Sequence, residues 1–170
     1  MINTDAEGRL IMADALVMAT DESPDAILDI ATLTGACMRA LGTEVAGVFG
    51  NDQGLVDQLL KAGASTDEPL WQLPLDKRYR GQLDSQVADL RNIGAGAPGE
   101  PGAITAALFL AEFVNGVPWA HVDIAGTAQN SATRLWRRTG GTGFGARLLI
   151  DLAMAFERPA RGDSIVSSDG

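Results

Sequence analysis

Residues 26–35 read AILDIATLTG, and this short stretch decides the class of fold. Residues 26–33 form a mostly apolar run with turn signals on both sides. A run of this length and composition is typical of a strand buried on both faces of a parallel sheet. Residues 45–49 and 119–124 are similar in character and predict two further strands.

Apolar residues at helical spacing fall between these strands. We expect helices over five segments: 8–21, 35–42, the residues after the Asn51-Asp52 cap, 103–114 and 145–156. Strands that alternate with helices predict an α/β domain, with a three-layer α/β/α arrangement around a largely parallel, mixed central sheet. Ligands of such sheets bind outside the carboxyl ends of the strands, which directs attention to residues 32–35 and 123–126.

The middle of the chain and its glycine-rich segments are less regular. The charged segment 76–84 is predicted to be helical, residues 86–90 to form a short strand and residues 94–102 to form a loop. Residues 94–99 read GAGAPG and match the G-x-G-x-x-G pattern of dinucleotide sites, but the polar residues before them do not form the strand that such a site requires. Residues 140–145 read GGTGFG and lack the lysine of a phosphate-binding loop, so we interpret them as a tight turn into a helix.

The composition is that of a single folded domain. The chain has 170 residues, of which 46% are hydrophobic and 21% charged, and these values exclude a wholly disordered chain and a coiled coil. No apolar stretch approaches the ~18 residues that a membrane-spanning helix needs, and the first residues lack the features of a secretory signal, so we expect a cytoplasmic protein. A formal net charge of -9 opposes binding to nucleic acids and to anionic membrane surfaces, so neither is expected as a partner.

The single cysteine and the single histidine limit the chemistry that the chain can perform. They exclude an internal disulfide, a Cys/His zinc finger and a histidine-rich metal cage, so oxygen atoms must hold any bound metal. We expect Cys37 to be a small core residue and His121, inside a predicted strand, to be a hydrogen-bonded structural histidine.

Residues 3–10 read NTDAEGRL and carry the most informative polar pattern. Residues two apart in an extended backbone share a face, so Asp5 and Glu7 present two carboxylates in one direction just before a helix begins. Paired carboxylates can hold divalent ions such as Mg²⁺, Mn²⁺ or Zn²⁺, and the planar fork of Arg9 can bind an anion. Acidic residues are also common at solvated helix starts, so the spacing alone leaves both interpretations open.

Three motifs together resemble those of the leucyl (cytosol) aminopeptidase family. They are NTDAEGRL at 3–10, ATLTGA at 31–36 and WAHVDIAG at 119–126, and they occur in the family's order and at similar separations. The resemblance extends from Ile2 to about Phe156. It implies a two-metal exopeptidase that releases N-terminal, leucine-like residues from peptide substrates.

The resemblance also implies roles for particular residues. Asp5 would ligate one metal ion and Glu7 would bridge both ions, which would be Zn²⁺ or Mn²⁺, with Mg²⁺ as an alternative. Arg9 would act in catalysis by holding a bicarbonate-like anion that serves as the proton-transferring base. Backbone groups of Leu33 and Gly35 would hydrogen-bond the peptide. The residues that line the substrate cleft would be Thr32, Leu33, Thr34 and Gly35.

The chain departs from the family pattern at its start. Complete members carry an upstream catalytic lysine, two further metal-binding aspartates, a glycine-rich metal-site segment and an N-terminal domain, and we find none of these here. We therefore expect residues 1–157 to be the C-terminal portion of a catalytic domain lacking its N-terminal strands, followed by a flexible tail over 158–170. The isolated chain is expected to be inactive, and the resemblance implies a homo-hexamer for an intact protein.

Two alternatives stay open at this point. The chain could be a non-catalytic scaffold or oligomer-interface remnant that keeps the fold without the chemistry, because the upstream half is missing. A nucleotide-binding module based on residues 94–99 is the more distant alternative.

Overall fold

The computed structural model describes residues 7–94, 100–133 and 138–159 of the protein. A four-stranded sheet stands at its centre, in the order β1-β4-β2-β3. The strands are β1 (Ile27–Ala31), β4 (Trp119–Asp123), β2 (Ala46–Gly50) and β3 (Leu70–Gln72). β1 is parallel to β4 and β2 is parallel to β3, whereas β2 and β4 are antiparallel. The sheet is therefore mixed and mostly parallel, as predicted.

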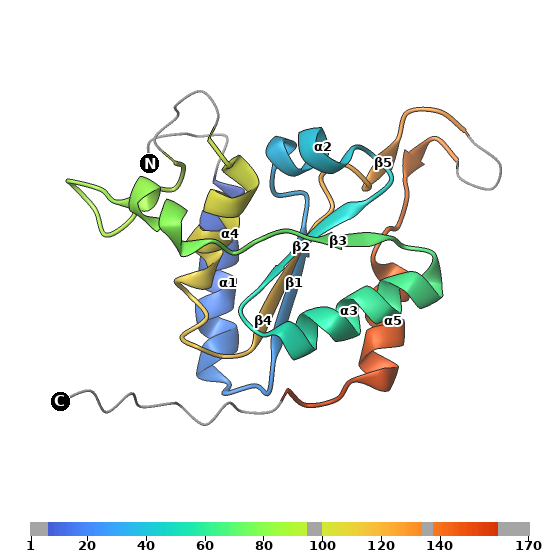
Figure 1. Cartoon of the computed structure of the whole chain (residues 1–170), viewed down its shortest axis with the longest axis horizontal. Helices are drawn as coiled ribbons and strands as arrows, with labels where there is room; N and C mark the ends of the chain where they lie inside the picture. The colour runs from blue at the N-terminus through green and yellow to red at the C-terminus, as the bar shows by residue number, and fades with distance from the viewer. Residues whose placement is uncertain (1–6, 95–99, 134–137, 160–170) are drawn as a thin grey trace.

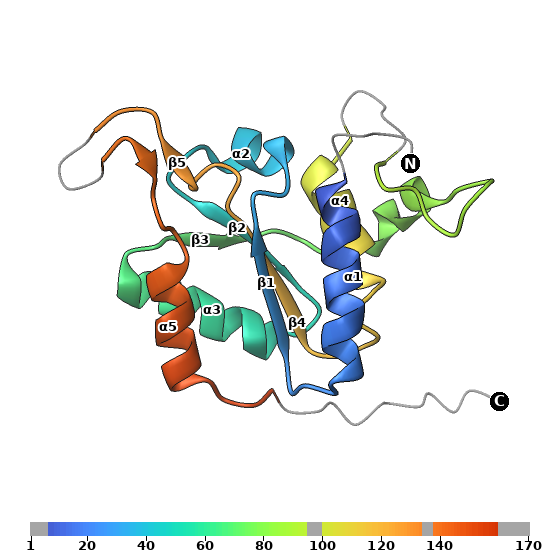
Figure 2. The same cartoon turned by 180° about the vertical axis from the view of Figure 1, so that it is seen from behind.

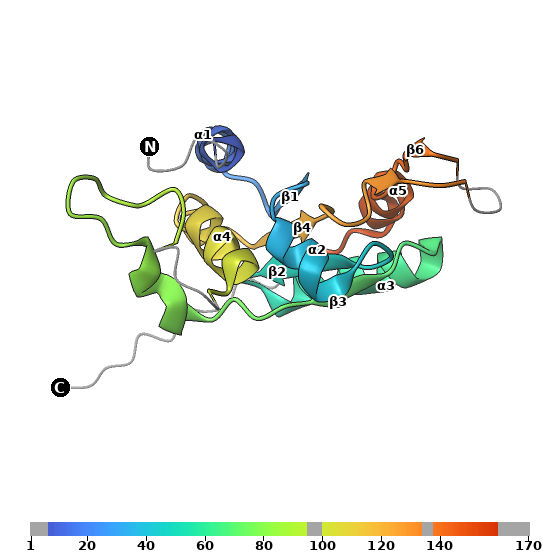
Figure 3. The ribbon, with the colours of Figure 1, turned by 90° about the horizontal axis from the view of Figure 1, so that it is seen from above.

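Helices cover both faces of this sheet, so the domain has three layers (Figures 1 and 2). α1 (Gly8–Asp21) and α4 (Gly102–Ala111) lie on one face, and α3 (Gln53–Thr66) and α5 (Ala146–Ala155) lie on the other (Figure 3). The short α2 (Gly35–Leu41) follows β1 directly, at the end of the sheet where β1 and β4 finish (Figure 1). The predicted α/β/α arrangement is confirmed.

Alternate residues of the strands build two cores, one on each face of the sheet. Phe49 and Trp119 pack with buried residues of α1 and α4. Val48 and Val122 point to the opposite face and pack with residues of α3 and α5. Because successive side chains of a strand point to opposite faces, β2 and β4 need apolar residues at nearly every position.

Local signals in the sequence determine where two of the helices begin. The Asp52 carboxylate accepts a hydrogen bond from the backbone N–H of Leu55 at 2.8 Å and so caps α3, as predicted. Gly145 precedes α5 with a φ of 94°, and a Cβ there would lie 2.3 Å from Cδ1 of Ile30, so this tight turn requires glycine. The predicted turn into the last helix is therefore confirmed.

The middle of the chain departs from expectation in three ways. The charged segment forms a 3₁₀ helix, η2 (Lys77–Leu83), which is a tighter form of the predicted helix. The strand predicted over 86–90 is wrong: these residues form bends, and Val87 is 92% exposed, so no buried face fixes a strand register. α4 ends at Ala111, three residues before the predicted end, because the chain turns through Asn115, whose φ is 47°.

Three short strands were not predicted: β3, β5 (Gln129–Asn130) and β6 (Gly140–Gly141). β5 and β6 form a separate antiparallel pair. β3 lies between Pro69 and Pro74 at an edge of the sheet, where prolines are tolerated. Most of the GAGAPG motif and most of the predicted tail lie outside the described residues. In the part of the chain that the structure describes, no helix is both long and apolar enough to cross a membrane.

Replacing Asp52 by alanine removes the cap of α3. We expect Asp52→Ala to lower the free energy of unfolding by about 1 kcal/mol, because the Leu55 N–H loses its acceptor. Asp52→Asn is the matched control, since asparagine caps helices about as well as aspartate. Urea denaturation measures the difference. Equal midpoints for Asp52→Ala and the unaltered chain would contradict the assigned cap.

Candidate functional site

The carboxyl ends of β1 and β4 meet at one end of the sheet, because the two strands are parallel. Ala31 lies opposite Asp123, and the backbone N–H of Ile124 donates to the Ala31 carbonyl oxygen at 2.9 Å. The segments that follow these strands therefore leave the sheet side by side; they are loop 32–35, whose last residue, Gly35, is also the first residue of α2, and loop 124–126. This is the edge at which the sequence predicted a ligand site.

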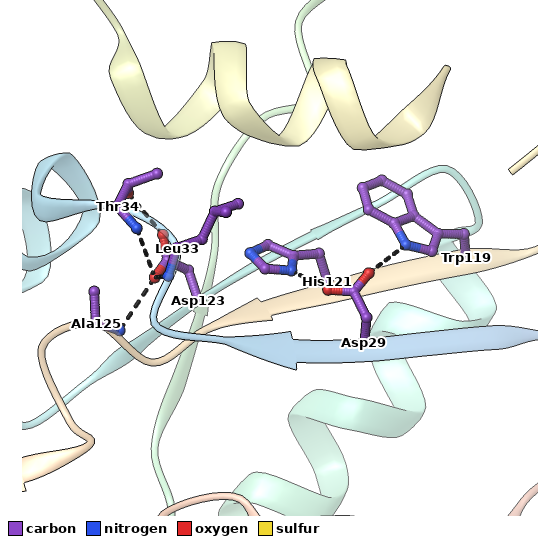
Figure 4. Close-up of polar contacts among 7 residues, drawn as sticks. All are labelled: Asp29, Leu33, Thr34, Trp119, His121, Asp123 and Ala125. Carbon is purple, nitrogen blue, oxygen red and sulfur yellow. Dashed lines mark hydrogen bonds and ion pairs between the residues drawn. The ribbon is translucent and has the colours of Figure 1, made fainter. Parts of the chain in front are cut away.

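The Asp123 carboxylate joins these two loops (Figure 4). Its Oδ1 accepts hydrogen bonds from three backbone N–H groups: those of Leu33 at 3.1 Å, Thr34 at 3.4 Å and Ala125 at 3.1 Å. Its Oδ2 accepts a hydrogen bond from Oγ1 of Thr34 at 2.7 Å. Asp123 is 1% exposed, so these donors take the place of water around its charge.

Thr34 extends the same network into α2. Its hydroxyl accepts a hydrogen bond from the backbone N–H of Cys37 at 3.0 Å, so it caps α2 while it donates to Asp123. Gly126, in the second loop, approaches the other end of α2 so closely that a Cβ would lie 2.0 Å from the carbonyl oxygen of Gly42. The two loops and both ends of α2 therefore pack as one unit.

The four residues predicted to line a substrate cleft lie together in this unit. Thr34 is buried, Leu33 is half-buried, and Thr32 and Gly35 are exposed. A cavity of about 500 Å³ opens beside Thr32. Residues of both loops and of α2 contribute to its lining, among them Thr32, Met38, Ala125 and Gly126. The loop thus borders a space large enough for an amino-acid side chain.

Arg9 comes from the first turn of α1 and lies near Asp123. Its residue exposure is 8%, and its Nε has no hydrogen-bond partner within the described ranges. Burial lowers the pKa of the Arg9 guanidinium, and the negative charge of Asp123 raises this pKa in part. A buried guanidinium with an unpaired N–H is suited to an anionic ligand.

The predicted metal ligands can be followed only in part. Asp5 lies outside the described residues. Glu7 directly precedes α1, its side chain is exposed and makes no capping hydrogen bond, and its carbonyl oxygen accepts from the Leu10 N–H at 2.9 Å. Among the residues described, no group of three or more His, Cys, Asp or Glu side chains is placed to hold a metal ion. Glu7 is thus available as a ligand, but the described residues alone do not fit a two-metal site.

A second buried polar group lies on the same face of the sheet, further from the loops (Figure 4). Nε1 of Trp119 donates to Oδ2 of Asp29 at 2.7 Å, and Nδ1 of His121 is hydrogen-bonded to Oδ1 of Asp29. His121 is fully buried and stacks with the rings of Phe49 and Trp119. The prediction of a hydrogen-bonded structural histidine is therefore confirmed.

No role was predicted for Asp29 or for the side chain of Asp123. Both are acidic residues inside otherwise apolar strands. Because a strand covered on both faces removes its side chains from water, a carboxylate there requires donors from other segments. An acidic residue inside an apolar strand is therefore the sequence signal that could have identified Asp29 and Asp123 as hydrogen-bonded buried residues.

The fold and this site define an α/β domain with a buried polar network at the carboxyl ends of two parallel strands. Comparison with known families identifies the family of this domain. Residues 1–150 match the catalytic domain of the cytosol aminopeptidase family. The chain belongs to this family, and the resemblance noted from its motifs is confirmed.

Curated relatives have the same family name. A probable cytosol aminopeptidase of Sinorhizobium fredii is 53% identical over 156 residues, which are 91% of this chain and 31% of the relative. The probable cytosol aminopeptidases of Syntrophotalea carbinolica and Neisseria meningitidis are each 53% identical over 89% of this chain, which covers 30% and 31% of those relatives. The chain therefore spans less than a third of the length of these relatives.

Cys37 of α2 is confirmed as a small core residue. It is 2% exposed, and its thiol donates to the carbonyl oxygen of Asp123 at 3.8 Å. Burial, and secondly the charge of Asp123, raise the pKa of the Cys37 thiol from 9.0 to about 11. The thiol therefore stays protonated at pH values where a free cysteine has begun to ionise.

We expect Cys37 to react slowly with iodoacetamide at alkaline pH. Because thiolate is the reacting form, raising the pKa from 9.0 to about 11 lowers the reactive fraction roughly 100-fold near pH 8. The rate should also keep rising with pH up to about 11. Mass spectrometry of the native chain measures alkylation, with the urea-unfolded chain as the control. Equal rates in the two states would contradict the burial of this thiol.

Proposed function

We propose that this chain supplies the carboxyl-terminal part of the catalytic centre of a metal-dependent aminopeptidase, which releases N-terminal, leucine-like residues from peptides. The observation that carries the proposal is the assembly of residues 32–35 and Arg9 around the buried Asp123 carboxylate. Membership of the cytosol aminopeptidase family supports the reaction class.

In this proposal the chain's own residues bind and orient the peptide. The Leu33 N–H donates to Asp123, so the carbonyl oxygen of Leu33 and main-chain groups of Gly35 hydrogen-bond the peptide backbone. The cavity beside Thr32 receives a substrate side chain. Arg9 would hold a bicarbonate-like anion, and that anion would supply a base for proton transfer when bound. The unpaired Nε of the Arg9 guanidinium supports this role.

Two divalent ions, Zn²⁺ or Mn²⁺ with Mg²⁺ as the alternative, supply Lewis-acid polarisation of the scissile carbonyl when they are bound. Asp5 and Glu7 are the ligands that this chain offers. Two ions need more ligands than these carboxylates, so we assign the remaining ligands to the part of the relatives' length that this chain does not span. The isolated chain is accordingly proposed to be inactive.

Open surfaces support completion of this domain by further polypeptide. β1 lies at an edge of the sheet within the described residues. Apolar side chains are exposed on two helices: Ile11 and Met18 on α1, and Ile150 and Met154 on α5. Proteins usually cover such edges and patches. We propose that they are covered in a complete, cytoplasmic homo-hexamer that acts on peptides and binds neither nucleic acid nor membranes.

A chimera tests the proposal. This chain replaces the matching 156-residue segment of the Sinorhizobium fredii relative, and hydrolysis of leucine amide is measured as kcat/KM. Glu7→Gln removes a proposed ligand of both ions. Deleting an outer hydrogen-bond partner of a metal ligand lowers activity roughly 10- to 100-fold. Because Glu7→Gln alters a proposed ligand itself, we expect it to lower kcat/KM by a larger factor.

Glu22→Gln is the matched control for this chimera. Glu22 follows the other end of α1 and is also exposed, so its replacement should leave kcat/KM unchanged. Undiminished turnover by Glu7→Gln, in a chimera that is itself active, would overturn the proposed ligand role.

A further inference from the structure

The Asp123 carboxylate accepts hydrogen bonds from two loops, residues 32–35 and 124–126. A carboxylate removed from water requires several strong donors, and an unpaired one would be costly. Asp123 has its donors only when Leu33, Thr34 and Ala125 keep their present backbone positions. The conformation of loop 32–35 is therefore tied to the charge of Asp123.

The hydrogen-bond partners of Asp123 also matter for Arg9. The charge of Asp123 acts on Arg9, yet no hydrogen bond joins the two residues in the part of the chain that the structure describes. A direct salt bridge would occupy the guanidinium fork with a carboxylate of the protein itself. The four hydrogen bonds to the Asp123 carboxylate come from the loops, and the Nε of Arg9 has no hydrogen-bond partner within the described residues, so it can donate to an anion.

We propose that Asp123 is a positioning residue for peptide hydrolysis: by holding the Leu33 N–H it fixes residues 32–35 so that the carbonyl oxygen of Leu33 and main-chain groups of Gly35 can meet the peptide backbone. This inference rests on the proposed function. Asp123 is 1% exposed, so it acts through Leu33 and through the Thr34 cap of α2.

Asp29 provides the comparison that separates positioning from simple stability. It is also an acidic residue on the same face of the sheet, and it is bonded to Trp119 and His121. Both partners belong to β4, so the bonds of Asp29 stay within the sheet. We expect the loss of the Asp29 charge to weaken the fold without releasing residues 32–35.

The test uses the active chimera with a leucyl dipeptide as substrate. Asp123→Asn keeps the side-chain shape but offers a neutral, weaker acceptor. We expect its KM to rise about tenfold, which corresponds to ~1.4 kcal/mol of binding, while kcat falls less than about threefold. Asp29→Asn should lower the thermal midpoint and leave KM unchanged.

Thr34→Val is a second variant for the case in which Asp123→Asn folds poorly. It removes the hydroxyl that bonds to Oδ2 of Asp123 and leaves the carboxylate in place. We expect KM to rise in the same direction by a smaller factor, because three of the four donors to Asp123 remain.

The outcomes separate the two proposals. An unchanged KM in Asp123→Asn or, where that variant does not fold, in Thr34→Val would overturn the positioning role alone. The same increase in KM for Asp29→Asn would also overturn it, because general destabilisation would then explain the effect. A chimera without any peptidase activity, although folded, would overturn the proposed function and this inference with it.

Discussion

The buried charge of Asp123 is the interaction on which the site depends. Its carboxylate accepts hydrogen bonds from three backbone N–H groups and one hydroxyl of the loops that follow β1 and β4. Through Thr34 it also sets the start of α2. Without these bonds the loops would lose a shared acceptor, and a carboxylate would be left buried and unpaired.

The register of the sheet makes this bonding possible. In the parallel pairing of β1 with β4, Ala31 lies opposite Asp123 and Asp29 lies opposite His121, so the polar side chains share one face. A shift of one residue would turn Asp123 toward the apolar core of α3 and α5, where Val122 now packs. The hydrophobic pattern and the buried charge therefore favour the same register.

Three of the four strands of the central sheet could be predicted from the sequence, whereas β3 and the bonding of the site could not. The apolar runs that became β1 and β4 are recognisable locally, but Leu33 and Asp123 are 90 positions apart, and neither segment alone shows that they pair. The strand predicted at 86–90 failed for a related reason: its residues have strand-like character, but Val87 faces solvent. The polar pattern of residues 3–10 drew attention to Glu7 and Arg9, but only the motif resemblance gave them roles, because spacing alone does not distinguish a ligand from a helix start.

Amide hydrogen exchange of the 170-residue chain tests the central claim most directly. The N–H groups of Leu33 and Ala125 lie in loops, so only the buried Asp123 acceptor explains slow exchange there. We expect both amides to exchange about as slowly as the amide of Val122 in β4. Exchange at the rate of an exposed loop, while Val122 stays protected, would contradict it.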